Sequence, residues 1–189
     1  MAQIGAIGSI GLIELSSVAQ GYVVQDVMLK AGSIQLLLAR SICSGKFLIV
    51  VTGDVTSVES ALLAGAAAAG PSLIERRLIA RVHPSVLAAI ANVVDFEPKQ
   101  LRAIGVVETF SAASIIEAAD AAIKAANVTL LRMHLAMALG GKGFLLMTGD
   151  VSSVQAAVAA SSKVAAEDGM LVGRAVIAAP SEELFRDYI

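Results

Sequence analysis

The segment IGLIE at residues 10–14 decides the fold, because it returns as IGVVE at residues 104–108. A second signature, TGDV, occurs at residues 52–55 and again at residues 148–151. The offset between the copies is 94 residues for the first signature and 96 residues for the second. The chain is therefore an internal tandem repeat whose second copy carries two extra residues between the signatures.

The two extra residues fall between the positions of Leu37 and Gly45, which is the part of the first copy that contains Cys43. Insertions between matched strands belong in loops, where the backbone can lengthen without breaking a sheet. Cys43 is therefore predicted to lie at or beside the one loop in which the two copies differ.

Both copies show the same predicted order of elements, read from apolar runs and helix caps. In the first copy the predicted strands are residues 8–15, 34–42, 47–52 and 73–82, with helices after Ser16 or Ser17 and from Asp54 to Ala69, and a short helix opened by Pro84. The order βαββαβ, used twice, predicts an α+β fold of two tandem ferredoxin-like domains. We place these domains at residues 1–95 and 101–189, joined by a linker at about residues 96–100.

Composition limits the class of protein. Hydrophobic residues make up 57% and charged residues 16% of the 189 residues, against roughly 45–50% and about 25% in average proteins. This excludes disorder, because the chain has ample apolar surface to bury. No stretch of 18 residues is both apolar and free of charge or proline, so we predict no membrane span. The excess of apolar residues favours burial against further copies of the chain.

Charge and cysteine content narrow the partners. The formal net charge is −2 and aromatic residues make up 4%, so neither a basic face nor a stacking platform for nucleic acid is expected. Cys43 is the single cysteine, which excludes an internal disulfide and is typical of a reducing cytoplasm.

Two glycine-rich turns and two aspartates recur in the repeat. Residues 44–46 and 140–143 contain a Gly-Lys pair, but each lies between two predicted strands and lacks the spacing of a phosphate-binding loop. We interpret them as hairpin turns. Asp54 and Asp150 follow a strand and a glycine, and this position favours a helix N-cap over a metal ligand or catalytic acid.

The remaining ionisable candidates do not form a catalytic constellation. His83 and His134 have no serine or cysteine nucleophile with an orienting carboxylate at a recognisable spacing. We therefore predict histidines at the surface or hydrogen-bonded in the core. Glu14 and Glu108 occupy equivalent strand positions, which suggests a role in assembly or local hydrogen bonding.

Cys43 leaves two interpretations open on the residues alone. A lone cysteine is commonly a small buried hydrophobe. One thiolate per chain is too few for a zinc ion or an iron–sulfur cluster. A loop placed on a three-fold axis, however, would bring three thiolates to one point.

Several motifs together resemble those of a known family. They are IGLIE at residues 10–14, KAGS at 30–33, ICSGKF at 42–47, TGDV at 52–55 and HPSV at 83–86, with IGVVE at 104–108 and GGK at 140–142 in the second copy. The combination covers nearly the whole chain and resembles bacterial microcompartment shell domains. The two unpermuted copies are similar to the tandem-domain trimeric shell proteins, above all those of propanediol-utilisation microcompartments.

The resemblance implies a structural protein of the cytoplasm, not an enzyme. Three chains would form a pseudohexameric plate that tiles with other shell proteins around encapsulated enzymes. The resemblance also implies a central pore lined by the two hairpin turns. The residues expected to line it are Ser41, Ile42, Ser44, Gly45, Lys46, Gly140, Gly141 and Lys142.

The resemblance further implies a cofactor. Cys43 of each of the three chains would hold one 4Fe–4S cluster at the pore, for electron transfer or cluster exchange across the shell, with an encapsulated redox enzyme as a possible partner. Three copies of Lys46 would offset the negative charge of the cluster. The alternative is the same trimer without a cluster, acting as a passive metabolite pore. A ferredoxin-like enzyme or sensor is disfavoured, because no acid/base or nucleophile set repeats.

Contacts between plates form the last expectation. Lys30 and Lys124 match the edge lysines of the family, although a solvated lysine at a helix end explains them equally well. The family usually carries an arginine near the last strand, whereas residues 177–181 of this chain read IAAPS. This departure removes one of the contacts on which tiling depends.

Overall fold

The computed structural model describes residues 8–91, 102–136 and 139–185. The chain divides into two compact units, Met1–Pro84 and Ser85–Ile189, which are described separately below. The linker predicted at residues 96–100 lies outside the described residues. The short helix α3 (Pro84–Ile90) groups mainly with the second unit, and the predicted domain limits remain a prediction.

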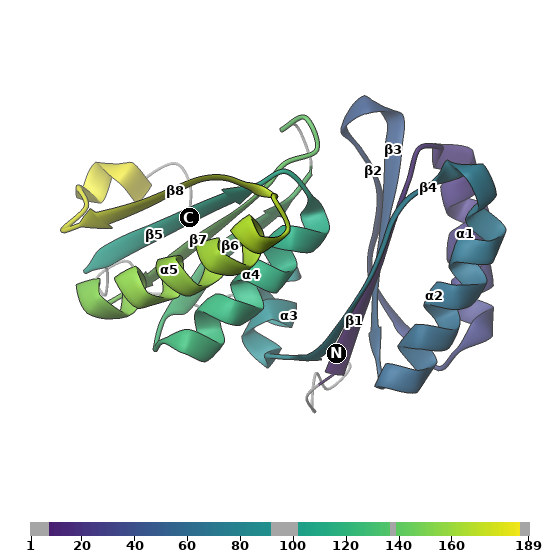
Figure 1. The fold of residues 1–189 in the computed structure, drawn as a ribbon, viewed down its shortest axis with the longest axis horizontal. Helices are drawn as coiled ribbons and strands as arrows, with labels where there is room; N and C mark the ends of the chain where they lie inside the picture. Colours follow the sequence, from purple (N-terminus) through teal and green to yellow (C-terminus); the bar gives the residue numbers. More distant parts are fainter. Residues whose placement is uncertain (1–7, 92–101, 137–138, 186–189) are drawn as a thin grey trace. The chain divides into compact units, whose positions relative to one another are not determined.

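The first unit is a four-stranded antiparallel sheet with two helices on one face (Figure 1). Its elements are β1 (Gly8–Leu15), α1 (Val18–Ala31), β2 (Gln35–Ile42), β3 (Lys46–Gly53), α2 (Val55–Ala69) and β4 (Leu73–Val82). The strand order is β2-β3-β1-β4. Short 3₁₀ segments, η1 (Cys43–Gly45) and η2 (Gly70–Ser72), join β2 to β3 and α2 to β4.

The second unit repeats this architecture (Figure 1). Its elements are β5 (Ala103–Thr109), α4 (Ala112–Ala125), β6 (Thr129–Leu135), β7 (Gly143–Gly149), α5 (Val151–Glu167) and β8 (Leu171–Ala178), followed by the 3₁₀ segment η4 (Glu182–Phe185). The strand order β6-β7-β5-β8 matches that of the first unit. The predicted α+β fold of two βαββαβ units is confirmed. Among the described residues, no helix is both long enough and apolar enough to span a bilayer.

The repeat extends to the irregularities of the sheets. The pairing of β2 with β3 shifts register between Leu36 and Leu38, and the pairing of β6 with β7 shifts between Leu130 and Arg132. These positions are equivalent at the offset of 94 residues. A β-bulge is a specific feature of a backbone, so the two units share their strand geometry in detail.

The core of the first unit lies between the sheet and its helices. Alternate residues of a strand point to opposite faces, so Ile13 and Leu15 of β1 share a face with Phe47, Ile49 and Val51 of β3. Helices α1 and α2 cover that face with Val24, Met28, Val58, Ala61, Leu62 and Ala69. All of these side chains are almost fully buried. Leu48 and Val50, on the other face of β3, are buried as well, so every residue of its apolar run is buried.

The two units fill one site of the core in opposite ways. In the first unit Gly21 of α1 faces Phe47 of β3, and a Cβ atom added to Gly21 would lie 2.4 Å from the Phe47 ring. In the second unit the equivalent positions are Ile115 of α4 and Gly143 of β7, and a Cβ atom on Gly143 would lie 2.6 Å from Ile115 Cγ2. The large side chain comes from the strand in one unit and from the helix in the other.

Helix caps follow the predicted pattern at three of the four main helices. The Ser17 hydroxyl accepts a hydrogen bond from the Gln20 N–H at 3.2 Å, and Ser111 accepts one from the Ser114 N–H at 3.1 Å. Asp54 caps α2 by accepting from the Ser57 N–H at 2.9 Å. Asp150 is the N-cap residue of α5, as predicted, but its side chain makes no capping hydrogen bond. Its Oδ1 instead pairs with Arg102 Nη1 at 3.0 Å, because an arginine precedes β5.

We expect Asp54→Ala to lower the melting temperature of the protein more than Asp150→Ala does, because of the two side chains only that of Asp54 makes a capping hydrogen bond. Hydrogen bonds from the side chain and the backbone N–H of Ser57 lower the pKa of Asp54. A lowered carboxyl pKa gives stability that is complete above the unfolded pKa and is lost as the pH falls through the folded pKa. Thermal unfolding at about pH 7 and about pH 2 checks this. A difference between wild type and Asp54→Ala that persists at the lower pH would contradict it.

Candidate functional site

The β2–β3 hairpin ends in the turn that carries Cys43. Strand β2 closes at Ile42 and β3 opens at Lys46, and these two residues are partners in the register of the sheet. Cys43, Ser44 and Gly45 span the three positions between them as a 3₁₀ turn. Cys43 is partly exposed and Ser44 and Gly45 are exposed. The prediction of a hairpin turn that joins two strands is confirmed.

Two consecutive residues of this turn have left-handed backbone conformations. Ser44 has φ 63° and ψ 29°, and Gly45 has φ 72°. A non-glycine residue with positive φ is uncommon and costs roughly 1 kcal/mol or more. A Cβ atom on Gly45 would meet nothing within 4 Å, so the backbone angle, not crowding, favours glycine there. The turn is therefore tight and open to its surroundings.

Each Gly-Lys turn is tied to the sheet by an ion pair. Lys46 Nζ lies 2.7 Å from Glu14 Oε1, and the Glu14 side chain is 6% exposed. Lys142 Nζ lies 3.2 Å from Glu108 Oε1, where both side chains are more than a third exposed. The local hydrogen bonding predicted for Glu14 and Glu108 is confirmed. Their lysine partners were not predicted, although glutamate and lysine both recur in the repeat.

The Lys46 pairing changes the predicted electrostatics of the turn. We expected three copies of Lys46 to offset the negative charge of a cluster. Glu14 Oε1 lies 2.7 Å from Lys46 Nζ, so this carboxylate already neutralises most of the positive charge of Lys46. Because opposite charges this close cancel at longer range, Lys46 supplies little net positive potential to its surroundings.

The other residues predicted to line a pore fall into three settings. Ser41 is exposed near the end of β2, whereas Ile42, the last residue of β2, is 6% exposed. Gly140 and Gly141, with φ 64° and 93°, form the turn of the β6–β7 hairpin. This turn closes where the Ala136 N–H donates to the Lys142 carbonyl at 3.1 Å.

The predicted edge lysines both pair along their own helices. Lys30 contacts Asp26 at the end of α1, and Lys124 contacts Asp120 at the end of α4. Such i, i+4 pairs on a helix surface contribute a few tenths of a kcal/mol each. At the other predicted edge, β8 ends at Ala178 with Val176 and Ile177 each 37% exposed. That strand end is apolar where the family usually carries an arginine.

The histidines take structural positions. The His134 ring on β6 stacks on the Phe144 ring of β7, with centroids 5.2 Å apart and planes 12° apart. His83 lies directly before α3. The prediction that the two histidines are not catalytic stays a prediction.

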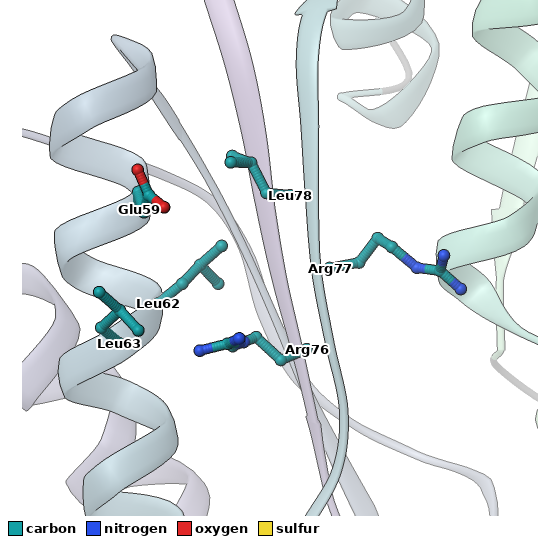
Figure 2. A pocket seen from close by; sticks show the side chains of 6 residues that line it. All are labelled: Glu59, Leu62, Leu63, Arg76, Arg77 and Leu78. Atoms are coloured by element: carbon teal, nitrogen blue, oxygen red, sulfur yellow. The ribbon is translucent and has the colours of Figure 1, made fainter.

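A small pocket lies between α2 and β4 of the first unit (Figure 2). Its volume is about 150 Å³, and it is lined by Glu59, Leu62, Leu63, Arg76, Arg77 and Leu78. Arg76 points toward α2 whereas Arg77 points away from it in Figure 2, and Arg77 Nη2 contacts Glu75 Oε1 at 3.2 Å. Sequence reasoning did not predict this pocket. Three of its six lining residues are charged and three are leucines, so the recess is mixed in character.

The described part of the chain holds no cluster of metal-binding side chains. Among residues 8–91, 102–136 and 139–185, no three histidine, cysteine or acidic side chains lie close enough to hold a metal ion.

Two βαββαβ units in tandem, each with a Gly-Lys hairpin turn, define a double-domain α+β protein. The model of the BMC domain family matches residues 9–82 and 103–180, which is most of the chain. The chain therefore belongs to the family of bacterial microcompartment shell proteins, whose members are structural and not enzymes.

Curated relatives match either the whole chain or one copy of the repeat. The chain is 43% identical over 181 residues to the bacterial microcompartment shell protein PduT of Citrobacter freundii, covering 96% of this chain and 97% of that protein. It is 38% identical over 84 residues to the carboxysome shell protein CcmK1 of Thermosynechococcus vestitus, covering 43% of this chain and 73% of that protein.

Solved structures show the same fold. A microcompartment protein from Desulfitobacterium hafniense matches with a TM-score of 0.91 and 42% identity, covering 95% of this chain and 98% of that one. A fused permuted hexameric shell protein from the RMM microcompartment matches with a TM-score of 0.63 and 20% identity, covering 86% and 83% of the two chains. The second likeness concerns the fold alone.

Proposed function

We propose that three copies of this chain form a pseudohexameric plate of a microcompartment shell. In this proposal, Cys43 of each chain contributes a thiolate to one 4Fe–4S cluster at the centre of the plate. The cluster serves electron transfer or cluster exchange across the shell. The partners are other shell proteins and an encapsulated redox enzyme.

One observation carries the proposal: Cys43 is at the tip of the hairpin in which the two copies of the repeat differ. The β2–β3 connection spans three residues, whereas the equivalent β6–β7 connection is longer and has no cysteine. Three chains would thus present three thiols and three cysteine-free turns around one axis. Alternate turns of two kinds are what a three-fold, rather than six-fold, centre requires.

Three Cys43 thiolates would bind three of the four irons of a shared cluster, and the fourth iron would lack a protein thiolate. Thiolates are the usual ligands of such clusters, and Cys43 is partly exposed at a turn whose neighbours Ser44 and Gly45 are small. When bound, the cluster would supply one-electron chemistry. The chain's own part is to present Sγ at the tip of a short turn and to let backbone N–H groups approach it. Such N–H groups help to set the potential of a cluster.

Exposed apolar residues support assembly with further copies. On α1 the side chains of Tyr22, Val23 and Leu29 are 66%, 51% and 42% exposed. On α4 the position equivalent to Tyr22 is Ile116, which is fully buried. The same helix position is thus buried in one copy of the repeat and exposed in the other. A large exposed side chain at such a position favours contact with a neighbouring chain.

We expect the protein purified without oxygen to hold about four iron and four sulfide ions per trimer. Cys43→Ser is expected to lose both while remaining trimeric, because one turn thiol contributes little to packing. Ser41→Ala, two residues away in β2, is the matched control and should keep both. Iron and acid-labile sulfide assays, with light scattering for the mass, check these outcomes.

Two results would overturn the cluster. The first is the absence of iron and sulfide in the wild type even after reconstitution with ferrous iron and sulfide, which would favour the passive metabolite pore. The second is loss of the trimer in Cys43→Ser with Ser41→Ala intact, which would make Cys43 a packing residue.

A further inference from the structure

An ion pair beside the Cys43 turn joins the central strand β1 to the first residue of β3. Glu14 lies on the central strand β1, and its side chain is 6% exposed. Lys46 is the first residue of β3, and its Nζ lies 2.7 Å from Glu14 Oε1. A charge-assisted hydrogen bond of this length is about twice as strong as a neutral one.

Glu14 needs Lys46 as its counter-charge. A buried carboxylate without a cation is strongly unfavourable. In the register of the sheet Glu14 lies opposite Glu75 on β4, so a second negative charge stands beside it. Arg77 pairs with Glu75 at 3.2 Å. The Lys46 side chain therefore stays paired with Glu14, and this pairing restrains the backbone at the start of β3.

The geometry of the hairpin transmits this restraint to Cys43. The turn has three residues between Ile42 and Lys46. Ile42 is paired with Lys46 in the register of the sheet, which fixes the β2 end, while the ion pair fixes the β3 end. A three-residue connection with both ends held leaves its first residue, Cys43, few alternative positions.

The second unit provides an internal comparison. There the Lys142–Glu108 distance is 3.2 Å, and the side chains are 38% and 36% exposed. Its connection runs from Leu135 to Gly143 and is longer than three residues. The shorter ion pair thus occurs in the copy that carries the cysteine, and the longer pair occurs in the copy that does not.

We propose that Glu14 is a positioning residue for Cys43, acting through Lys46 to hold the three-residue turn in the conformation that presents the thiolate. The inference rests on the proposed function, in which three such thiolates must meet at one point. A shared metal centre tolerates little displacement of its ligands. Fixing the turn before assembly would supply that accuracy.

The test compares Glu14→Gln with Glu108→Gln, which removes the equivalent charge beside the turn without a cysteine. Both proteins are reconstituted with ferrous iron and sulfide. The release of iron to a chelator is then followed by absorbance, and the midpoint potential is measured. Glu14→Gln is expected to release iron about tenfold faster than wild type, because the Gln oxygen can still accept from Lys46 but lacks the negative charge that strengthens the bond, and to shift the potential. Glu108→Gln is expected to match wild type.

A second readout does not depend on a cluster. The rate at which Cys43 of the iron-free protein reacts with a thiol reagent is expected to rise severalfold in Glu14→Gln and to stay unchanged in Glu108→Gln. If the wild type never takes up iron, the proposed function fails, and this rate alone decides the role of Glu14. Lys46→Arg keeps the cation, so both readouts are expected to change less than they do in Glu14→Gln.

Asp54→Ala is a control for general destabilisation of the first unit. It removes the cap of α2, which is not part of the Cys43 turn, and is expected to leave both rates unchanged. Should Glu14→Gln fail to fold, Glu14→Asp keeps the charge, shortens the side chain by one methylene, and is expected to shift both rates in the same direction. Rates that equal wild type in the folded Glu14 variant would overturn the inference, as would equal changes in Glu108→Gln.

Discussion

Gly21→Ile is expected to destabilise the first unit by more than about 3 kcal/mol, and adding Phe47→Gly to the same chain is expected to restore a large part of the loss. The reason is the site at which the two units exchange large and small residues. Even a Cβ atom at position 21 would lie 2.4 Å from the Phe47 ring. The double variant copies the arrangement of Ile115 and Gly143, which the second unit already accommodates.

Phe47→Gly alone is expected to cost about 4 kcal/mol, because it empties a fully buried ring site. A double-mutant cycle by urea unfolding gives the coupling between the two positions. Hydrogen exchange followed by mass spectrometry assigns the loss to the first unit. The reverse exchange, Ile115→Gly with Gly143→Phe, is the matched control in the second unit. Additive costs in both cycles would contradict the size exchange.

Lys46→Met is expected to destabilise the protein by about 3 kcal/mol, because it leaves the buried carboxylate of Glu14 without its cation. Lys142→Met makes the same chemical change at the equivalent position of the second unit. It is expected to cost less than about 1 kcal/mol, since Glu108 is more than a third exposed and water replaces the lysine.

Chemical unfolding of the two variants side by side checks the Lys46 prediction. Met is close to Lys in length and helps to keep the packing of the aliphatic stem, so the comparison isolates the charge. A cost for Lys142→Met equal to that of Lys46→Met would show that burial of the glutamate does not govern the strength of the pair.

The local features of the fold were predictable because they depend on neighbours in the sequence. Strands at residues 8–15 and 73–82 have the predicted bounds, since glycine, proline and cap residues mark their ends. Ser17 and Asp54 cap helices as predicted. The repeat then carried the topology of the first unit over to the second.

Features that depend on contacts across the sheet were not predictable from one sequence. Asp150 has the same local context as Asp54 but turns to Arg102, a residue 48 positions away. The pairing of Lys46 with Glu14 joins residues 32 positions apart. The exchange of large and small residues at Gly21 and Phe47 could not be predicted, because the sequence does not show that this helix position faces this strand position. The residue types at the two positions also differ between the copies.

The neutralised lysines also bear on what an assembled pore would admit. A lone lysine acts at a distance as a monopole, whereas a lysine held at 2.7 Å by a carboxylate acts as a short dipole, whose field decays faster with distance. In the proposed trimer the Glu14–Lys46 and Glu108–Lys142 pairs would alternate around the opening as six such dipoles. That opening would steer anionic metabolites only weakly, so the width of the turns would govern passage more than the count of lysines.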